Sequence, residues 1–128
     1  MTVSNLDAAC AALGAKLGAS GNKDTENSIT KALGVLEEQG VYALFLYLHA
    51  REKDWGKATS NELATFLRQQ PSQPHALLGA SNKEEPFGAL HQLATDLDKL
   101  LFARDLLHRA LVYARYHAKA AQNAGART

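Results

Sequence analysis

The chain has 128 residues, of which 46% are hydrophobic and 21% charged, so it has the size and composition of one folded domain. The chain has fourteen lysines and arginines and thirteen acidic residues, so its formal net charge is +1. This overall charge is too small to bind the protein to nucleic acid or to a membrane by itself. The longest near-apolar run, 41–48, is far shorter than the roughly 20 residues of a membrane span. We expect no signal peptide. The single cysteine, Cys10, permits no intrachain disulfide, which favours a reducing cytoplasm.

Apolar residues recur at intervals of three and four in the first third of the chain, which is the period of a helix. They predict a first amphipathic helix over 6–17, which Gly14 and Gly18 weaken because glycine is a poor helix former. A second helix is expected from residue 24 or 25 onward. Gly40 is expected to cap its C-terminal end.

The run 41–48 is rich in aromatic and branched residues, a pattern shared by buried strands and buried helices. No other segment alternates as a strand does, so a strand here would have no partner. We therefore expect a buried central helix ending near residue 52 or 53, followed by a turn at 54–56. The sequence Thr59-Ser60-Asn61-Glu62 has the form of a capping box, which predicts that a fourth helix begins there.

Pro71 and Pro74 are expected to end the fourth helix and to begin a loop, in which 76–78 can form a short helical turn. Residues 81–86 are expected to lead into a fifth helix.

The longest helix is predicted from about Thr95 to Ala121, and 123–128 are expected to be a frayed tail. Asp96 either caps this helix afresh or lies inside a continuous one. The sequence thus predicts an all-α fold, a compact bundle of about five to six helices with a long C-terminal helix.

No recognisable catalytic or metal motif appears in the sequence. The five histidines include no pair with the spacing of zinc ligands and a third ligand nearby. Asp105 and His108 are three residues apart on the last helix, which suits a surface charge pair better than a di-metal bundle, since such a bundle needs four carboxylates. The glycines before Lys23 lack the Gly-Lys-Ser/Thr order of a phosphate-binding loop. We expect no enzyme activity, no metal and no cofactor.

The last helix carries the clearest functional pattern. At about 100° per residue, small and apolar side chains gather on one face that is expected to pack in the core. These residues are Leu100, Ala103, Leu107, Ala110, Leu111, Ala114, Ala118 and Ala121. Beside that face lies a set of four residues, here called the basic stripe, which consists of Arg104, His108, Arg115 and Lys119.

Six lysines or arginines and only one acid lie in 99–127, so positive charge is concentrated here although the whole chain is nearly balanced. This distribution is typical of polyanion binding. The alternative is that the cations only complement the dipole at the end of the helix, which explains Arg115 and Lys119 but not Arg104. We expect the basic stripe to bind RNA.

On the far side of the same helix, Phe102, Leu106 and Tyr113 form a second apolar patch. A helix that is apolar on two sides either lies centrally in its own fold or contacts another subunit. We expect this patch to be a subunit interface.

Two stretches carry a resemblance to a known family. Residues 39–46 resemble a glycine followed by an Ala-Leu-rich central helix, and 110–119 resemble a closing helix in which an Ala-Leu pair precedes an aromatic residue and a basic doublet. Both are similar to the small subunit of type III-B CRISPR effector complexes, the RNA-targeting Cmr complexes. The family usually has an acid where Arg109 stands and a tryptophan where Tyr116 stands. Of its basic doublet, only Lys119 is present here.

The resemblance implies a non-catalytic, cytoplasmic subunit of an antiviral ribonucleoprotein complex, with no contact to a membrane. Several copies would stack head-to-tail beside the guide RNA and the target RNA, and cleavage would be left to other effector subunits. The basic stripe would then follow the phosphate backbone without reading bases. The alternatives are a type III-A small subunit, or a helical adaptor that binds another protein and no nucleic acid. A small metal-binding or ligand-binding bundle is disfavoured by the histidine spacing.

Overall fold

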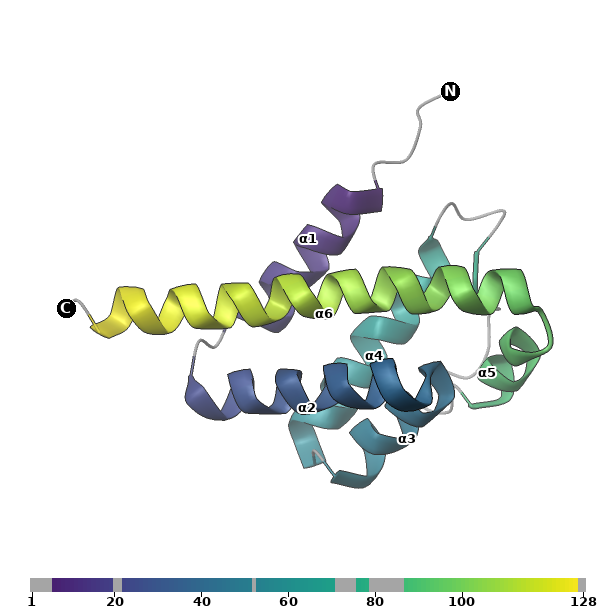
Figure 1. Ribbon diagram of the computed structural model, residues 1–128, viewed down its shortest axis with the longest axis horizontal. Coiled ribbons are helices and arrows are strands. Elements are labelled where there is room, and N and C mark those ends of the chain that lie inside the picture. The colour runs from purple at the N-terminus through teal and green to yellow at the C-terminus, as the bar shows by residue number, and fades with distance from the viewer. Residues whose placement is uncertain (1–5, 20–21, 52, 71–75, 79–86, 127–128) are drawn as a thin grey trace.

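A computed structural model describes residues 6–19, 22–51, 53–70, 76–78 and 87–126 of the chain. These residues form six α-helices and no strand, which confirms the predicted all-α bundle with a long C-terminal helix (Figure 1). In chain order the helices are α1 (Leu6–Leu17), α2 (Lys23–Gln39), α3 (Val41–Arg51), α4 (Lys53–Gln69), α5 (Phe87–Ala94) and α6 (Leu97–Ala126). None of them is long and apolar enough to cross a membrane.

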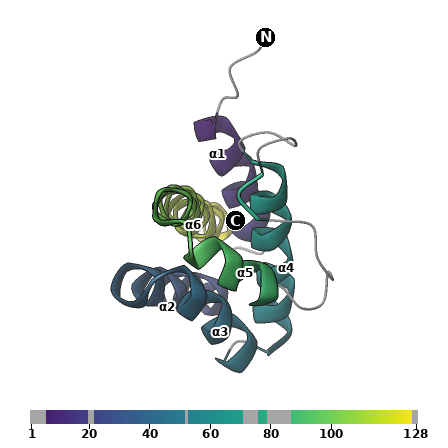
Figure 2. The same ribbon diagram turned by 90° about the vertical axis from the view of Figure 1, so that its right-hand side faces the viewer.

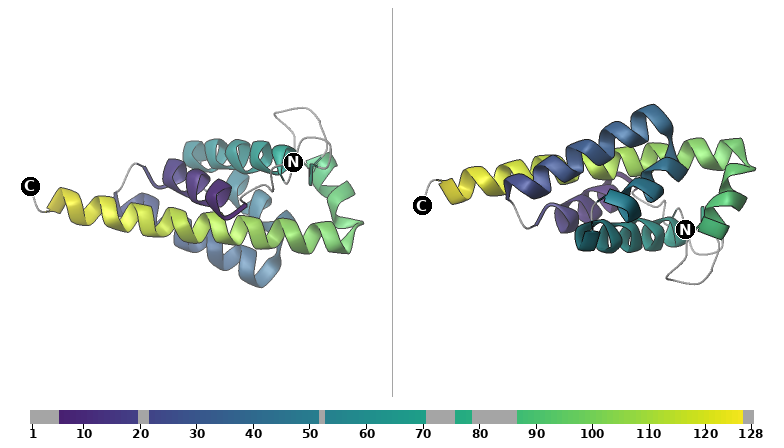
Figure 3. Two further views of the ribbon diagram at one scale, coloured as in Figure 1. Left: turned by 90° about the horizontal axis from the view of Figure 1, so that it is seen from above. Right: turned by 90° about the horizontal axis from the view of Figure 1, so that it is seen from below.

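Helix α6 is the central element of the bundle. It has 30 residues and packs mainly against α1 and α2, while α3 packs between α2 and α4. Figure 2, which looks along α6, shows α1 and α2 on different sides of it. The views from above and below in Figure 3 show α4 beside α1, on the side of α6 away from α2. The predicted core face of α6 is confirmed at Ala103, Leu107, Ala110, Leu111, Ala114 and Ala118, which are buried. Leu100 is only partly buried and Ala121 is exposed.

Helix α2 is capped at both ends by residues whose chemistry suits the position. The side chain of Asn22 accepts a hydrogen bond of 2.7 Å from the backbone N–H of Thr25, which satisfies one of the free donors of the first turn. Gly40 has φ 99° and ψ −173°, a conformation that is essentially restricted to glycine. Its N–H donates to the carbonyls of Val35 and Leu36, so the predicted cap at Gly40 is confirmed.

The prediction for the start of α4 was wrong. This helix begins at Lys53 and passes through the expected turn at 54–56 and the expected capping box. Thr59 and Ser60 are 2% and 0% exposed, so both lie against the core and neither begins a helix. The hydroxyl of Ser60 is 2.9 Å from Nε2 of His49. Ser60 therefore has a tertiary partner, and Thr59 cannot act as an N-cap because the helix already runs through it.

The connections around α5 and α6 also differ in detail from the prediction. Residues 76–78 form a bend instead of a helical turn, and the backbone N–H groups of Leu77 and Leu78 donate to the carbonyls of Gln70 and Leu67. The expected helix entrance at 81–86 lies outside the described residues. Asp96 caps α6 afresh, because its carboxylate accepts a hydrogen bond from the N–H of Lys99.

Helix α6 continues as far as Ala126, five residues beyond the predicted end. The alanine-rich composition of 118–126 favours this extension, since alanine is the strongest helix former.

Helices α1 and α6 approach each other closely because two glycines, Gly14 inside α1 and Gly18 directly after it, face α6. A Cβ atom added at Gly14 would lie 2.5 Å from Cβ of Tyr113 and 2.9 Å from the carbonyl oxygen of Ala110. A Cβ at Gly18 would overlap the backbone of α6 at Ala114. The glycines that weaken α1 as an isolated helix thus allow its backbone to pack directly against that of α6.

Candidate nucleic-acid interface

The basic stripe lies along the edge of α6 that faces α2. At one end of the stripe, Arg104 donates a hydrogen bond of 3.1 Å from Nη2 to the backbone carbonyl of Glu37. His108 is next on this edge, and its Nε2 lies 2.6 Å from a carboxylate oxygen of the same glutamate. The side chains of His108 and Glu37 are 37% and 53% exposed, so water screens this pair. Glu37 therefore fixes the position of this end of the stripe and partly neutralises it.

A second glutamate of α2 lies at the other end of the stripe. Glu26 accepts a hydrogen bond of 2.8 Å from the side-chain amide of Gln122 and lies 3.7 Å from the ammonium of Lys23. The pKa of Glu26 is lowered, chiefly by the Gln122 hydrogen bond and also by the charges of Lys119 and Lys23. Glu26 and Glu37 are thus both held at the α2 side of the stripe, one near each end.

Arg115 lies between these two acidic positions. It is partly buried, and it makes no ion pair or hydrogen bond with any residue that the structure describes. Lys119, one turn further along, is exposed. Arg104, Arg115 and Lys119 are permanent cations set against the carboxylates of Glu26 and Glu37, so the edge keeps a positive excess, centred on Arg115 and Lys119.

An exposed aromatic ring adjoins the same part of α6. Tyr116 is 66% exposed, beside Arg115 and one turn before Lys119 in the helix. Arg109, two turns before Tyr116, is held by Asp7 and Asp105, at 3.6 Å from each carboxylate. Asp105 therefore does not pair with His108, as the sequence suggested, but with the arginine four residues on.

The three residues of the predicted interface patch pack wholly or partly within this chain. Leu106 is only 1% exposed, and its carbonyl accepts a hydrogen bond from the Cys10 thiol. Tyr113 packs over Gly14 and donates a 2.7 Å hydrogen bond to Asp7, while Phe102 is partly buried against the core. This side of α6 is apolar in the sequence because it packs against α1 in the fold. The alternative of a central helix is the one that the fold supports.

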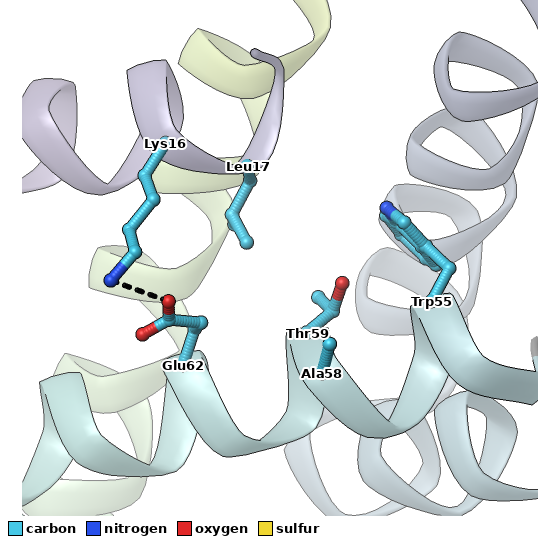
Figure 4. Close-up of a pocket in the computed structure, with 6 residues that line it drawn as sticks. All are labelled: Lys16, Leu17, Trp55, Ala58, Thr59 and Glu62. Carbon is cyan, nitrogen blue, oxygen red and sulfur yellow. Dashed lines mark ion pairs between the residues drawn. The ribbon is translucent and has the colours of Figure 1, made fainter. Parts of the chain in front are cut away.

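A groove between α1 and α4 was not anticipated from the sequence. It contains two adjoining hollows, of about 300 and 410 Å³, which share Lys16 and Glu62 in their walls. These two side chains form an ion pair of 2.6 Å across the groove. Figure 4 shows this pair together with Leu17 of α1 and the ring of Trp55 from α4. The groove is open. Its hollow beside Trp55 is mainly apolar, whereas the other hollow is about half polar and is also lined by Thr65, Gln69 and Gln70. An open groove with this mixed lining suits the side of a protein helix.

In the described part of the chain two hydroxyls lie against imidazoles. The phenolic hydroxyl of Tyr42 is 3.1 Å from Nε2 of His91, and the hydroxyl of Ser60 is 2.9 Å from Nε2 of His49, but Ser60 has no exposed surface. A substrate cannot reach a hydroxyl in that position. Cys10 is equally buried, and burial raises the pKa of its thiol to about 11, which keeps it protonated and unreactive at neutral pH. Within the described part of the chain, no three His, Cys, Asp or Glu side chains lie close enough to hold a metal ion.

Comparison with known proteins adds no relative to this description: no family model, curated protein or solved structure matches the chain.

Proposed function

We propose that this chain is a non-catalytic helical subunit of a ribonucleoprotein, and specifically the small subunit of a type III-B CRISPR effector complex. In this proposal the basic stripe contacts the phosphate backbone of the guide RNA and the target RNA. The observation that carries it is the positive edge of α6, where Arg115 has no partner among the described residues and Lys119 is exposed. A cation that is left without an internal partner remains available for a phosphate.

Two further features support the proposal. Both stretches of family resemblance fall on elements that organise the fold, because 39–46 spans the Gly40 cap and the start of α3, and 110–119 is the centre of α6. The bundle also holds the stripe on a long packed helix, which is the rigid support that repeated contacts with a backbone need. The type III-A small subunit is the alternative within this class.

Stacking of several copies is part of the same proposal and needs two different complementary faces on each copy. The groove between α1 and α4 offers one such face, and it replaces the patch at Phe102, Leu106 and Tyr113. The cytoplasmic setting follows from the proposed complex.

The RNA-backbone proposal is tested with two triple variants that change the net charge equally. One replaces Arg104, Arg115 and Lys119 by glutamate. The control replaces exposed cations outside the stripe, at Lys31, Arg51 and Lys57. The stripe variant should lose affinity for RNA in the reconstituted complex, and the dependence of log affinity on log salt should fall by about 2 to 3 units if each cation contacts one phosphate. The control variant should retain most of its affinity for RNA and most of its salt dependence.

Equal losses in the two triple variants would mean that net charge alone attracts RNA, and unchanged binding by the stripe variant would refute the proposal. Circular dichroism checks that both variants keep their helices. Neighbouring genes for CRISPR effector subunits would support the particular family, and their absence would count against it.

A helical adaptor is the second candidate, and the α1–α4 groove is the observation that favours it. The outward side of α1 adds to that surface, because Ala12 and Ala15 are exposed and carry no charge. Helices pack closely over such small side chains. An Ala12→Glu variant should then lose its protein partner or its neighbouring copy while it binds RNA normally. If this variant assembles normally, the groove is not a docking surface.

A further inference from the structure

The exposed tyrosine of α6 supports an inference that deepens the proposed function and rests on it. Among the phenylalanine, tyrosine and tryptophan residues that the structure describes, only Tyr116 is exposed. Its hydroxyl forms no hydrogen bond with any of the described residues. Tyr113, one turn earlier, is by contrast packed over Gly14 and bonded to Asp7. The fold uses Tyr113 to attach α1, and it leaves Tyr116 in water, where the ring contributes little to the stability of the core.

The cations near Tyr116 on α6 differ in their surroundings. Arg109 is two turns before Tyr116 on nearly the same face, and its charge is partly offset by the carboxylates of Asp7 and Asp105, 3.6 Å away. Arg115 and Lys119 are four residues apart on α6, so their side chains are neighbours on the helix surface, separated by about 6 Å along its axis. Lys119 is one turn after Tyr116 and Arg115 directly precedes it in α6, so the exposed ring and the two cations belong to one stretch of the helix surface.

We propose that Tyr116 is a stacking platform for an unpaired base of a single-stranded nucleic acid whose phosphates contact Arg115 and Lys119. A double helix hides the faces of its bases inside the stack, whereas a single strand presents them, and aromatic side chains bind those faces. Stacking on a ring accepts any base, so it agrees with a stripe that does not read sequence.

The proposal separates this site from a purely electrostatic one. Cations alone bind duplex, single strand or any other polyanion according to charge density. An acidic peptide would use Arg115 and Lys119 in the same way and would gain little from the ring. Tyr116 adds a contact that only a ligand with a free planar base can use. The site is therefore specific for single strands without being specific for sequence.

The test uses Tyr116→Ala, with Tyr116→Phe as the matched control that keeps the ring and removes only the hydroxyl. Affinity is measured at low salt for two probes, a fluorescent single-stranded oligoadenylate and inorganic polyphosphate, which carries phosphates without bases. Tyr116→Ala should weaken oligoadenylate binding by at least about fivefold, the lower end of the range for loss of one stacked base. Polyphosphate binding should be unchanged, and Tyr116→Phe should resemble the original protein with both probes.

An Arg115→Glu variant distinguishes failure of this inference from failure of the proposed function. If Arg115→Glu weakens binding of both probes while Tyr116→Ala changes neither, phosphate binding stands and the stacking platform is refuted. An equal loss on both probes in Tyr116→Ala also refutes stacking, because polyphosphate has no base. If neither probe responds to Arg115→Glu, the RNA-backbone function fails and the inference fails with it. If Tyr116→Ala blocks contact with another protein subunit but leaves oligoadenylate binding unchanged, the ring belongs to a protein interface.

Discussion

Replacing Gly14 by alanine tests the close contact between α1 and α6. Inside an ordinary helix this substitution stabilises, because alanine exceeds glycine by about 0.8–1.0 kcal/mol in helix propensity. At Gly14, however, the new Cβ would lie 2.5 Å from Cβ of Tyr113 and 2.9 Å from two backbone atoms of α6. Neither neighbour is the end of a flexible side chain, so the two helices must move apart. Overpacking of this kind costs about 1–3 kcal/mol. We expect a net loss of roughly 1–2 kcal/mol in the free energy of unfolding.

Gly34→Ala is the matched control for this substitution. Gly34 lies inside α2, and a Cβ added there would have no heavy atom within 4 Å. The same change should therefore stabilise the protein by up to about 1 kcal/mol. In thermal unfolding followed by circular dichroism, the midpoint should fall by about 4–8 °C for Gly14→Ala and rise by up to about 4 °C for Gly34→Ala. If Gly14→Ala is as stable as Gly34→Ala, the close approach of α1 to α6 is wrong.

Two other predictions follow from the backbone and from the buried thiol. Gly40→Ala should lower the free energy of unfolding by about 1–3 kcal/mol without a steric clash, because φ 99° and ψ −173° suit only glycine, and denaturant titration measures the loss. Cys10 should react with an aromatic disulfide reagent only as fast as the protein opens, and a fast reaction of the native protein would contradict its burial. Since the pKa of Cys10 rises from 9.0 to about 11 on folding, its neutral form contributes stability that is complete below pH 9 and declines between pH 9 and 11, which a midpoint measured against pH detects.

Periodicity within single helices was sufficient to predict most of the fold. The spacing of leucines and alanines in α6 identified its core face, and Gly40 identified the end of α2. Both predictions succeeded because each depends only on residues close together in the sequence. The start of α4 was missed for the same reason. Thr59 has the local chemistry of a helix cap, but burial against other helices decides its conformation, and the sequence of 59–62 does not contain that information.

The candidate site was predictable only in part. The basic stripe follows from the wheel of one helix, so Arg115 and Lys119 were found. Glu26 and Glu37, which hold the ends of the stripe, lie on another helix, and their place beside it depends on how α2 packs against α6. The same limit explains the patch around Leu106. Its apolar character was visible in the sequence, but the helix that covers it lies at the other end of the chain.

The pairing of α1 with α6 also has a consequence for how the chain is made. Cys10 bonds to Leu106 and Asp7 to Tyr113, across 96 and 106 positions of sequence. At a synthesis rate of about 5–20 residues per second, roughly 5–20 s separate the appearance of α1 from that of the α6 surface that receives Gly14 and Gly18. Asp7 and Lys16 are the only charged residues of α1, so most of the helix is uncharged. During this interval its apolar surface is exposed because α6 has not yet been made. We expect the nascent chain to need protection by a chaperone until α6 has emerged, and the last step of folding to be the docking of its first helix.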